Sequence, residues 1–132
     1  MVIQFSTPAN RACYFSLMEQ PLDRGIHLFN RRQFFECHEV WEAVWTPERG
    51  PRRLFLQSLI HFAVAFYHTE RGNPLGAGRQ LRKGLRKLAA YLPSCEAIDT
   101  ARLHADCLIA LQRIDSGEAA FEYPRIHLSP PA

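Results

Sequence analysis

The chain has 132 residues, of which 47% are hydrophobic and 22% charged, a balance typical of one globular domain and not of a disordered or fibrous protein. Its formal net charge of +3 is too small to indicate a nucleic-acid-binding protein, for which a strongly basic face is expected. The longest apolar-rich stretch, residues 54–67, is too short and too polar to cross a bilayer. We therefore expect no membrane partner, and the small charge favours other partners over nucleic acid.

Four cysteines are spaced without a C-x-x-C pair and match no standard zinc motif. Cys37 and Cys107 fall within apolar helical patterns, so we expect both to be reduced core residues. Unpaired thiols and the lack of a secretory signal pattern at the start favour the reducing cytoplasm as the location of the protein.

The first predicted elements are helical. Residues 1–20 are interpreted as an N-terminal extension that could hold a short helix, because Thr7-Pro8 is a helix-start signal. The predicted domain, 21–118, begins with a short amphipathic stretch at 22–31. A clearer helix follows at 33–45, where apolar residues share one face and Thr46-Pro47 ends the pattern.

The middle of the chain predicts a central, largely buried helix over about residues 51–71, because it is apolar almost all round. Gly72 is expected to end it in the left-handed conformation, and Asn73 to cap the next helix, 74–92. A last helix is predicted from about residue 100 to Asp115, before a proline-rich tail, 119–132, that lies extended across the bundle. The fold class is all-α, a compact bundle of about five helices.

The first candidate for chemistry is His38-Glu39-x-x-Glu42 on the second predicted helix. Positions i and i+4 share one side of a helix, so His38 and Glu42 could hold a ligand together, whereas Glu36 and Glu39 point away from the core. The H-E-x-x-H zinc motif needs a second histidine, which Glu42 replaces here. A histidine hydrogen-bonded at the edge of the core is the simpler interpretation.

The second candidate is a polar stripe on the central helix. Gln57, His61 and His68 project within about 40° of one another on an otherwise apolar helix. A buried polar group without a partner costs about 1–3 kcal/mol, so the stripe must meet another helix, water, a metal or a ligand. We expect its partners to be His38 and Glu42, since helices joined by a short linker usually pack antiparallel. The cluster is then either a structural network or the lining of a small-ligand pocket.

Two basic residues, Arg52 and Arg53, fall in the first turn of the central helix, where the helix dipole favours acids. Glu39, Glu42 or a bound anion could supply the missing negative charge, and solvation at the surface is an equally adequate explanation. The glycines after Asn73 lack the lysine and spacing of a phosphate-binding loop and are better explained by close helix packing.

Five segments carry a resemblance: LFN (28–30), FFECHEVWE (34–42), GPRRLFLQ (50–57), LIHFAV (59–64) and RGNPLGA (71–77). Together they are similar to the domain-of-unknown-function family numbered 309, over about residues 22–92. The resemblance implies a compact all-α bundle of prokaryotic origin without an assigned activity. It implies shared polar positions at Glu36, His38, Glu39, Glu42, Gln57, Arg71 and Asn73. Members often carry Gln at the position of His61, which argues against an essential metal-ligand role there.

The sequence leaves three functions open. The favoured one is a helical binding or interaction module for a small ligand or a protein, with candidate site residues Glu36, His38, Glu39, Glu42, Arg52, Arg53, Gln57, His61, His68 and Asn73. The second is a metal-dependent hydrolase with His38, Glu42 and His68 as ligands, although no cofactor is evident and Glu39, the proposed base, points about 100° away. The third is a weak nucleic-acid accessory protein that uses the Lys/Arg face of residues 79–87.

Overall fold

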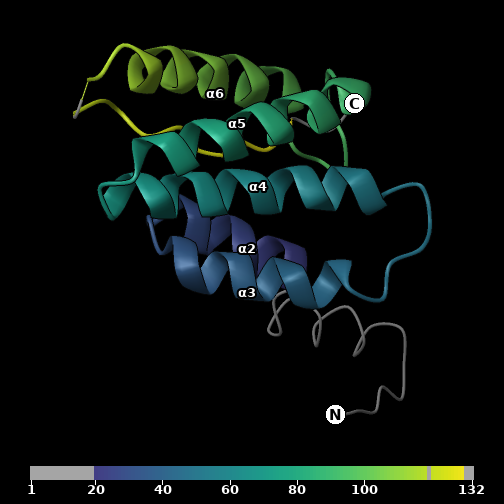
Figure 1. Cartoon of the computed structure of the whole chain (residues 1–132). Helices are drawn as coiled ribbons and strands as arrows, with labels where there is room; N and C mark the ends of the chain where they lie inside the picture. Colours follow the sequence, from purple (N-terminus) through teal and green to yellow (C-terminus); the bar gives the residue numbers. More distant parts are fainter. Residues whose placement is uncertain (1–19, 119, 130–132) are drawn as a thin grey trace, which may run out of the picture.

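The computed structural model describes residues 20–118 and 120–129, which form a bundle of α-helices with one short 3₁₀ helix (Figure 1). The elements are α2 (Pro21–Asn30), α3 (Phe34–Trp45), α4 (Arg53–Glu70), α5 (Pro74–Leu88), η1 (Ala89–Tyr91) and α6 (Thr100–Asp115). The predicted all-α bundle of about five helices is confirmed. The short helix considered for residues 1–20 lies outside the described residues, and the domain limits 21–118 stay a prediction.

Helix ends follow the predicted signals closely. The side chain of Asn73 accepts a hydrogen bond from the N–H of Gly76 at 3.0 Å and caps α5, while Gly72 has a φ of +74°. The central helix α4 begins two residues later than predicted, because the N–H of Arg53 closes a tight turn onto the carbonyl of Gly50. Residues 89–91 continue α5 as a 3₁₀ turn, which shortens the predicted helix 74–92.

Helix α4 lies at the centre of the bundle, with α3 packed on one side and α5 on the other (Figure 1). Helix α2 packs against α3, and α6 packs against α5. The buried face of α4 includes Phe55, Phe62 and Phe66, none of which is accessible to solvent. The predicted central helix is therefore confirmed, although Leu54 at its start is half exposed.

Two helices approach closely where α2 meets α3. A Cβ atom on Gly25 would lie 2.0 Å from Nε1 of Trp41, so only glycine fits this position. The thiol of Cys37 donates a hydrogen bond to the carbonyl of Gly25 at 3.2 Å. Cys37 and Cys107 are both buried free thiols, as predicted.

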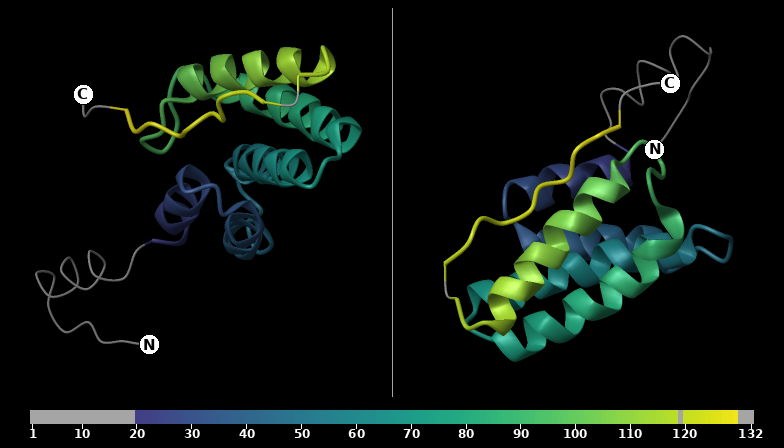
Figure 2. Two further views of the ribbon diagram at one scale, coloured as in Figure 1. Left: turned by 90° about the vertical axis from the view of Figure 1, so that its left-hand side faces the viewer. Right: turned by 90° about the horizontal axis from the view of Figure 1, so that it is seen from above.

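The tail runs extended across the bundle, as predicted for its described part, 120–129 (Figure 2). The side chain of Asn30 accepts from the N–H of Ile126 at 2.7 Å and donates to its carbonyl at 3.0 Å. The Tyr123 ring lies against Phe34 and Phe66, with centroids 5.7 and 5.4 Å away. The tail therefore packs against α2, α3 and α4.

Within residues 20–118 and 120–129, no helix is long and apolar enough to cross a membrane. The cytoplasmic location stays a prediction.

Candidate functional site

The predicted pair on α3 is formed, and it lies at the surface. Nε2 of His38 lies 3.2 Å from Oε1 of Glu42, and its Nδ1 lies 3.3 Å from the carbonyl oxygen of Phe35. The side chains of His38 and Glu42 are 24% and 48% exposed. Because both neighbours are acceptors, the ring donates to both at once only when it carries two protons.

Aromatic side chains extend this pair onto α4. The Phe35 ring, 47% exposed, lies 5.7 Å from the ring of His38 and 5.6 Å from that of Tyr67. The ring centroids of Tyr67 and His68 lie 6.3 Å apart, and the guanidinium of Arg71 lies 5.5 Å from the centroid of the Tyr67 ring. These contacts form a continuous surface between α3 and the end of α4. We call it the His38–His68 surface, made of Phe35, His38, Glu42, Tyr67, His68, Arg71 and Asn73.

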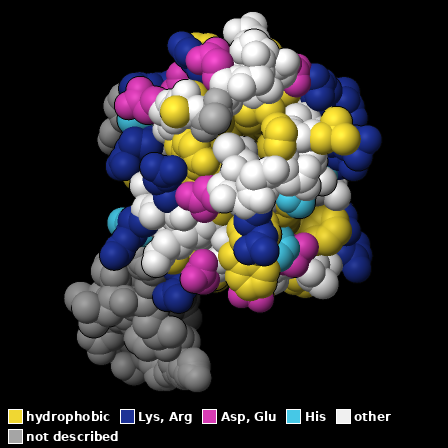
Figure 3. All heavy atoms as spheres, turned by 60° about the vertical axis from the view of Figure 1, so that its left-hand side comes forward, with side chains coloured by type: hydrophobic (Ala, Val, Ile, Leu, Met, Phe, Trp, Pro, Cys, Tyr) yellow, Lys and Arg dark blue, Asp and Glu magenta, His cyan; other side chains and the backbone are white. Residues whose placement is uncertain are grey.

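The turn between α4 and α5 holds the far edge of this surface in place. Nδ2 of Asn73 lies 3.4 Å from Nδ1 of His68, while its Oδ1 caps α5. A Cβ atom on Gly76 would lie 2.5 Å from Nδ2 of Asn73 and 3.2 Å from the His68 ring. Gly76 therefore leaves the space in which Asn73 and His68 meet. In Figure 3, histidine side chains lie beside hydrophobic and charged ones on the face that carries this end of the bundle.

The predicted single buried cluster is wrong, because the stripe on α4 meets two different neighbours. His61 faces α5, where its Nδ1 lies 2.7 Å from Oε1 of Gln80 and its Nε2 lies 2.8 Å from Nζ of Lys87. His68 instead joins the surface described above, and Gln57 is half-buried on α4. Burial lowers the pKa of His61, an effect that its hydrogen bond to Gln80 opposes.

The proposed metal ligands are not assembled into a centre. Among the residues described, no three His, Cys, Asp or Glu side chains are grouped closely enough to hold a metal ion. His38 and Glu42 supply two neighbouring groups, while the contacts of His68 are with Tyr67 and Asn73. Glu36 and Glu39 are exposed on α3.

The arginines at the start of α4 find partners other than those predicted. Arg52 forms two hydrogen bonds of 2.7 Å to the carboxylate of Glu96, and Glu48 lies 3.6 Å away. The hydrogen bond to Glu96 raises the pKa of Arg52. Arg53 donates to the carbonyls of Trp45 and Glu48 and lies 4.1 Å above the Trp45 ring. Glu96 precedes α6 in the chain, so no local pattern could have identified it.

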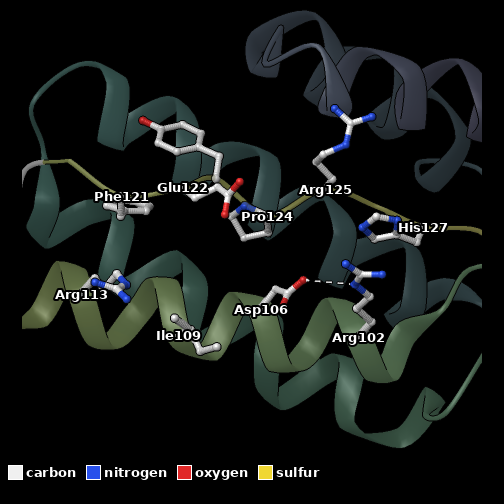
Figure 4. Close-up of a pocket in the computed structure, with 10 residues that line it drawn as sticks. Arg102, Asp106, Ile109, Arg113, Phe121, Glu122, Pro124, Arg125 and His127 are labelled. Atoms are coloured by element: carbon white, nitrogen blue, oxygen red, sulfur yellow. Dashed lines mark ion pairs between the residues drawn. The ribbon is translucent and has the colours of Figure 1, made fainter.

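A cleft of about 500 Å³ lies between α6 and the tail (Figure 4). Its lining residues are Arg102, Asp106, Ile109, Arg113, Phe121, Glu122, Tyr123, Pro124, Arg125 and His127. No pattern in the sequence indicates this cleft, because its walls come from segments that carry no recognisable motif. Its cations are already engaged: Arg102 lies 3.7 Å from Asp106, Arg113 pairs with Glu118 at 2.9 Å, and Arg125 donates to the carbonyl of Asn30.

Two smaller cavities lie elsewhere. One of about 230 Å³ is lined in part by Thr69, Gly72 and Phe121, and one of about 260 Å³ in part by Arg52 and Glu96. None of the three cavities is lined by a residue of the His38–His68 surface. The small-ligand pocket that the sequence suggested for this cluster therefore stays a prediction.

Comparison with known proteins supports the resemblance and adds no activity. The chain is 34% identical over 85 residues to the uncharacterized protein YpuF of Bacillus subtilis (strain 168). This match covers 62% of the chain and 49% of the Bacillus protein, so the chain spans about half the length of this relative. Residues 22–80 match the family model described as Domain of unknown function (DUF309), which confirms the family resemblance for the segment that carries α2, α3, α4 and the first part of α5.

Proposed function

We propose that the protein is a binding module that recognises a partner protein through the His38–His68 surface. The proposal rests on the Phe35 side chain. It lies beside the rings of His38 and Tyr67, and about half of Phe35 is exposed to solvent. Aromatic residues and arginine are enriched at the centres of protein interfaces, because they bury a large area and retain polar contacts. Phe35, Tyr67 and Arg71 supply these residue types side by side.

The position of the surface within the family segment also supports it. All seven of its residues fall between 35 and 73, inside the matched segment 22–80. The walls of the 500 Å³ cleft lie between 102 and 127, outside that segment. A function common to the family is expected in the part that its members share.

The exposure of the surface favours a protein over a small molecule, because Phe35 is 47% exposed and the Glu42 side chain 48%. Small-molecule sites are concave and bury most of the ligand, whereas protein interfaces are larger and flatter. The edges of this surface carry Glu42 on one side and Arg71 on the other, which would fix the orientation of a partner with complementary charges.

Site-specific photo-crosslinking tests the proposal. A benzophenone amino acid replaces Phe35 in one protein and Leu108 in a second, because Leu108 is 41% exposed on α6, away from the surface. In the cells that produce the protein, we expect one discrete adduct from position 35 and none of that mass from position 108. Identical adduct patterns from the two positions, or no adduct from position 35, would contradict the proposal.

A titration with the purified partner then measures the contribution of single side chains. Phe35→Ala and Arg71→Ala are each expected to weaken binding at least about tenfold, the effect of a residue worth about 1.4 kcal/mol. Leu108→Ala should leave the affinity unchanged, and circular dichroism should report intact helices in all three variants. Equal affinities for all three variants would refute a role of the surface.

Elemental analysis of the purified protein separates this function from the metal-dependent alternative. A stoichiometric transition metal or zinc that disappears in a His38→Ala variant would favour the enzyme. Protein that binds its partner without metal would favour the interaction module.

A further inference from the structure

The chain uses arginine for nearly all its positive charge. Of its sixteen Lys and Arg residues only two are lysine, Lys83 and Lys87, one turn apart on α5. A guanidinium does not lose its proton in proteins, whereas a lysine ammonium can become a nucleophilic amine. These two lysines are therefore the only side-chain amines in the chain.

The two lysines have different surroundings. Lys83 is exposed, whereas Lys87 is half-buried, with its Nζ 2.8 Å from Nε2 of His61. On the other side of the ring, Nδ1 of His61 lies 2.7 Å from the amide oxygen of Gln80. An amide oxygen only accepts hydrogen bonds, so Nδ1 carries the proton and Nε2 presents a lone pair to Lys87. Gln80 thus selects the tautomer in which His61 can take a proton from the amine.

The electrostatic environment favours the reactive forms of both groups. Burial lowers the pKa of Lys87, and the charges of Lys83 and Arg86 lower it further. Burial also lowers the pKa of His61, as do the charges of all three of these basic residues, so its Nε2 is unprotonated at neutral pH. Lys83 and Arg86 place positive charge beside the amine, where an anionic reagent would approach.

We propose that Lys87 is an acylation site for acyl phosphates, with His61 as the acceptor of the amine proton. Lys87 reacts as the free amine: its Nζ forms a bond to the acyl carbon, and the bond from that carbon to the phosphate oxygen breaks. Phosphate leaves with the bonding electron pair beside Lys83 and Arg86. The N–H proton passes to Nε2 of His61 and then to water, and the product is a neutral amide.

The test measures acetylation of the native protein with acetyl phosphate. Initial rates at Lys83 and Lys87 are followed by peptide mass spectrometry, which also separates the reaction of the chain's amino terminus. We expect Lys87 to react at least about fivefold faster than Lys83, a modest share of the ~10²-fold that an organised general base supplies. In protein unfolded in urea, the ratio of the acetylation rate of Lys87 to that of Lys83 should be near one. Equal rates in the native protein, or a faster Lys83, would overturn the proposal.

A His61→Gln variant tests the role of the base. Glutamine can still accept a hydrogen bond from Lys87 but cannot take its proton, so the rate ratio is expected to fall toward one. A ratio that stays at the native value in the folded variant would remove His61 from the mechanism. A neutral acetyl thioester of a small thiol tests the anion preference, and a Lys87:Lys83 ratio as large as that for acetyl phosphate would overturn the assignment to acyl phosphates. If the variant does not fold, the native ratio and the thioester comparison still decide.

Discussion

Gly84 on α5 is the position where the packing of the central helix is most sensitive to one added methyl group. A Cβ atom there would lie 2.5 Å from Cε1 and 2.8 Å from Cδ1 of Phe62, whose side chain is fully buried on α4. Alanine favours the helix over glycine by about 1 kcal/mol, while overpacking a core costs about 1–3 kcal/mol. The Phe62 ring is fully buried and can move only by displacing its neighbours, so we expect Gly84→Ala to lower the free energy of unfolding by up to about 2 kcal/mol.

Gly78 provides the matched control on the same helix. Its Cβ would meet the end of the Arg82 side chain at 3.1 Å, and a flexible guanidinium can move aside. Gly78→Ala should therefore keep most of the helix-propensity gain and raise the free energy of unfolding by up to about 1 kcal/mol. Urea unfolding followed by circular dichroism measures both variants. A Gly84→Ala protein as stable as Gly78→Ala would refute the close approach of α4 and α5 described above.

Three further outcomes follow from the described contacts. Asn73→Ala is expected to lower the free energy of unfolding by about 1 kcal/mol through loss of the α5 cap, and unchanged urea unfolding would contradict the cap. A thiol reagent should label Cys95 in the native protein and leave the fully buried Cys37 and Cys107 unlabelled. Because burial raises the pKa of Cys95, the labelling rate of Cys95 should still be rising above pH 9.0. Labelling of Cys37 at the same rate as Cys95 would contradict the packing. In the folded protein the pKa of His61 is lowered from 6.5, so the unfolded chain takes up a proton at this position first, and stability should fall as the pH drops from 6.5 toward the folded pKa. A His61→Gln variant should lack this part of the pH dependence. Identical stability profiles for the two proteins would contradict this role of His61.

Local signals predicted the helices well, because the residues that end and begin helices in this chain act on the backbone only a few positions away. Gly72 adopts a positive φ and Asn73 caps the following helix, both within a few residues of the pattern that indicates them. The same holds for the His38–Glu42 pair, since an i,i+4 contact depends only on the helix that carries it.

The partners of the polar stripe were not predictable in the same way. Helical periodicity gives the direction of a side chain around its own axis, and it does not say which neighbouring helix lies in that direction. His61 meets Gln80 and Lys87 because α5 returns alongside α4, and the long lysine side chain reaches the ring from the next helix. Similarly, Arg52 pairs with Glu96, which is 44 residues away in sequence. Such contacts depend on tertiary packing, and the sequence pattern alone does not show which distant residues come together.

Both proposals involve α4, so their tests must be separable. His61 and His68 are two helical turns apart, about 10 Å along the axis. Tyr67 contacts His68 and Phe35, while the neighbours of Lys87 are His61, Lys83 and Arg86. A Tyr67→Ala variant should therefore lose partner binding and keep the excess of Lys87 over Lys83 acylation, whereas His61→Gln should do the reverse. If each variant abolished both effects, the common cause would be damage to α4, and neither local mechanism would be supported.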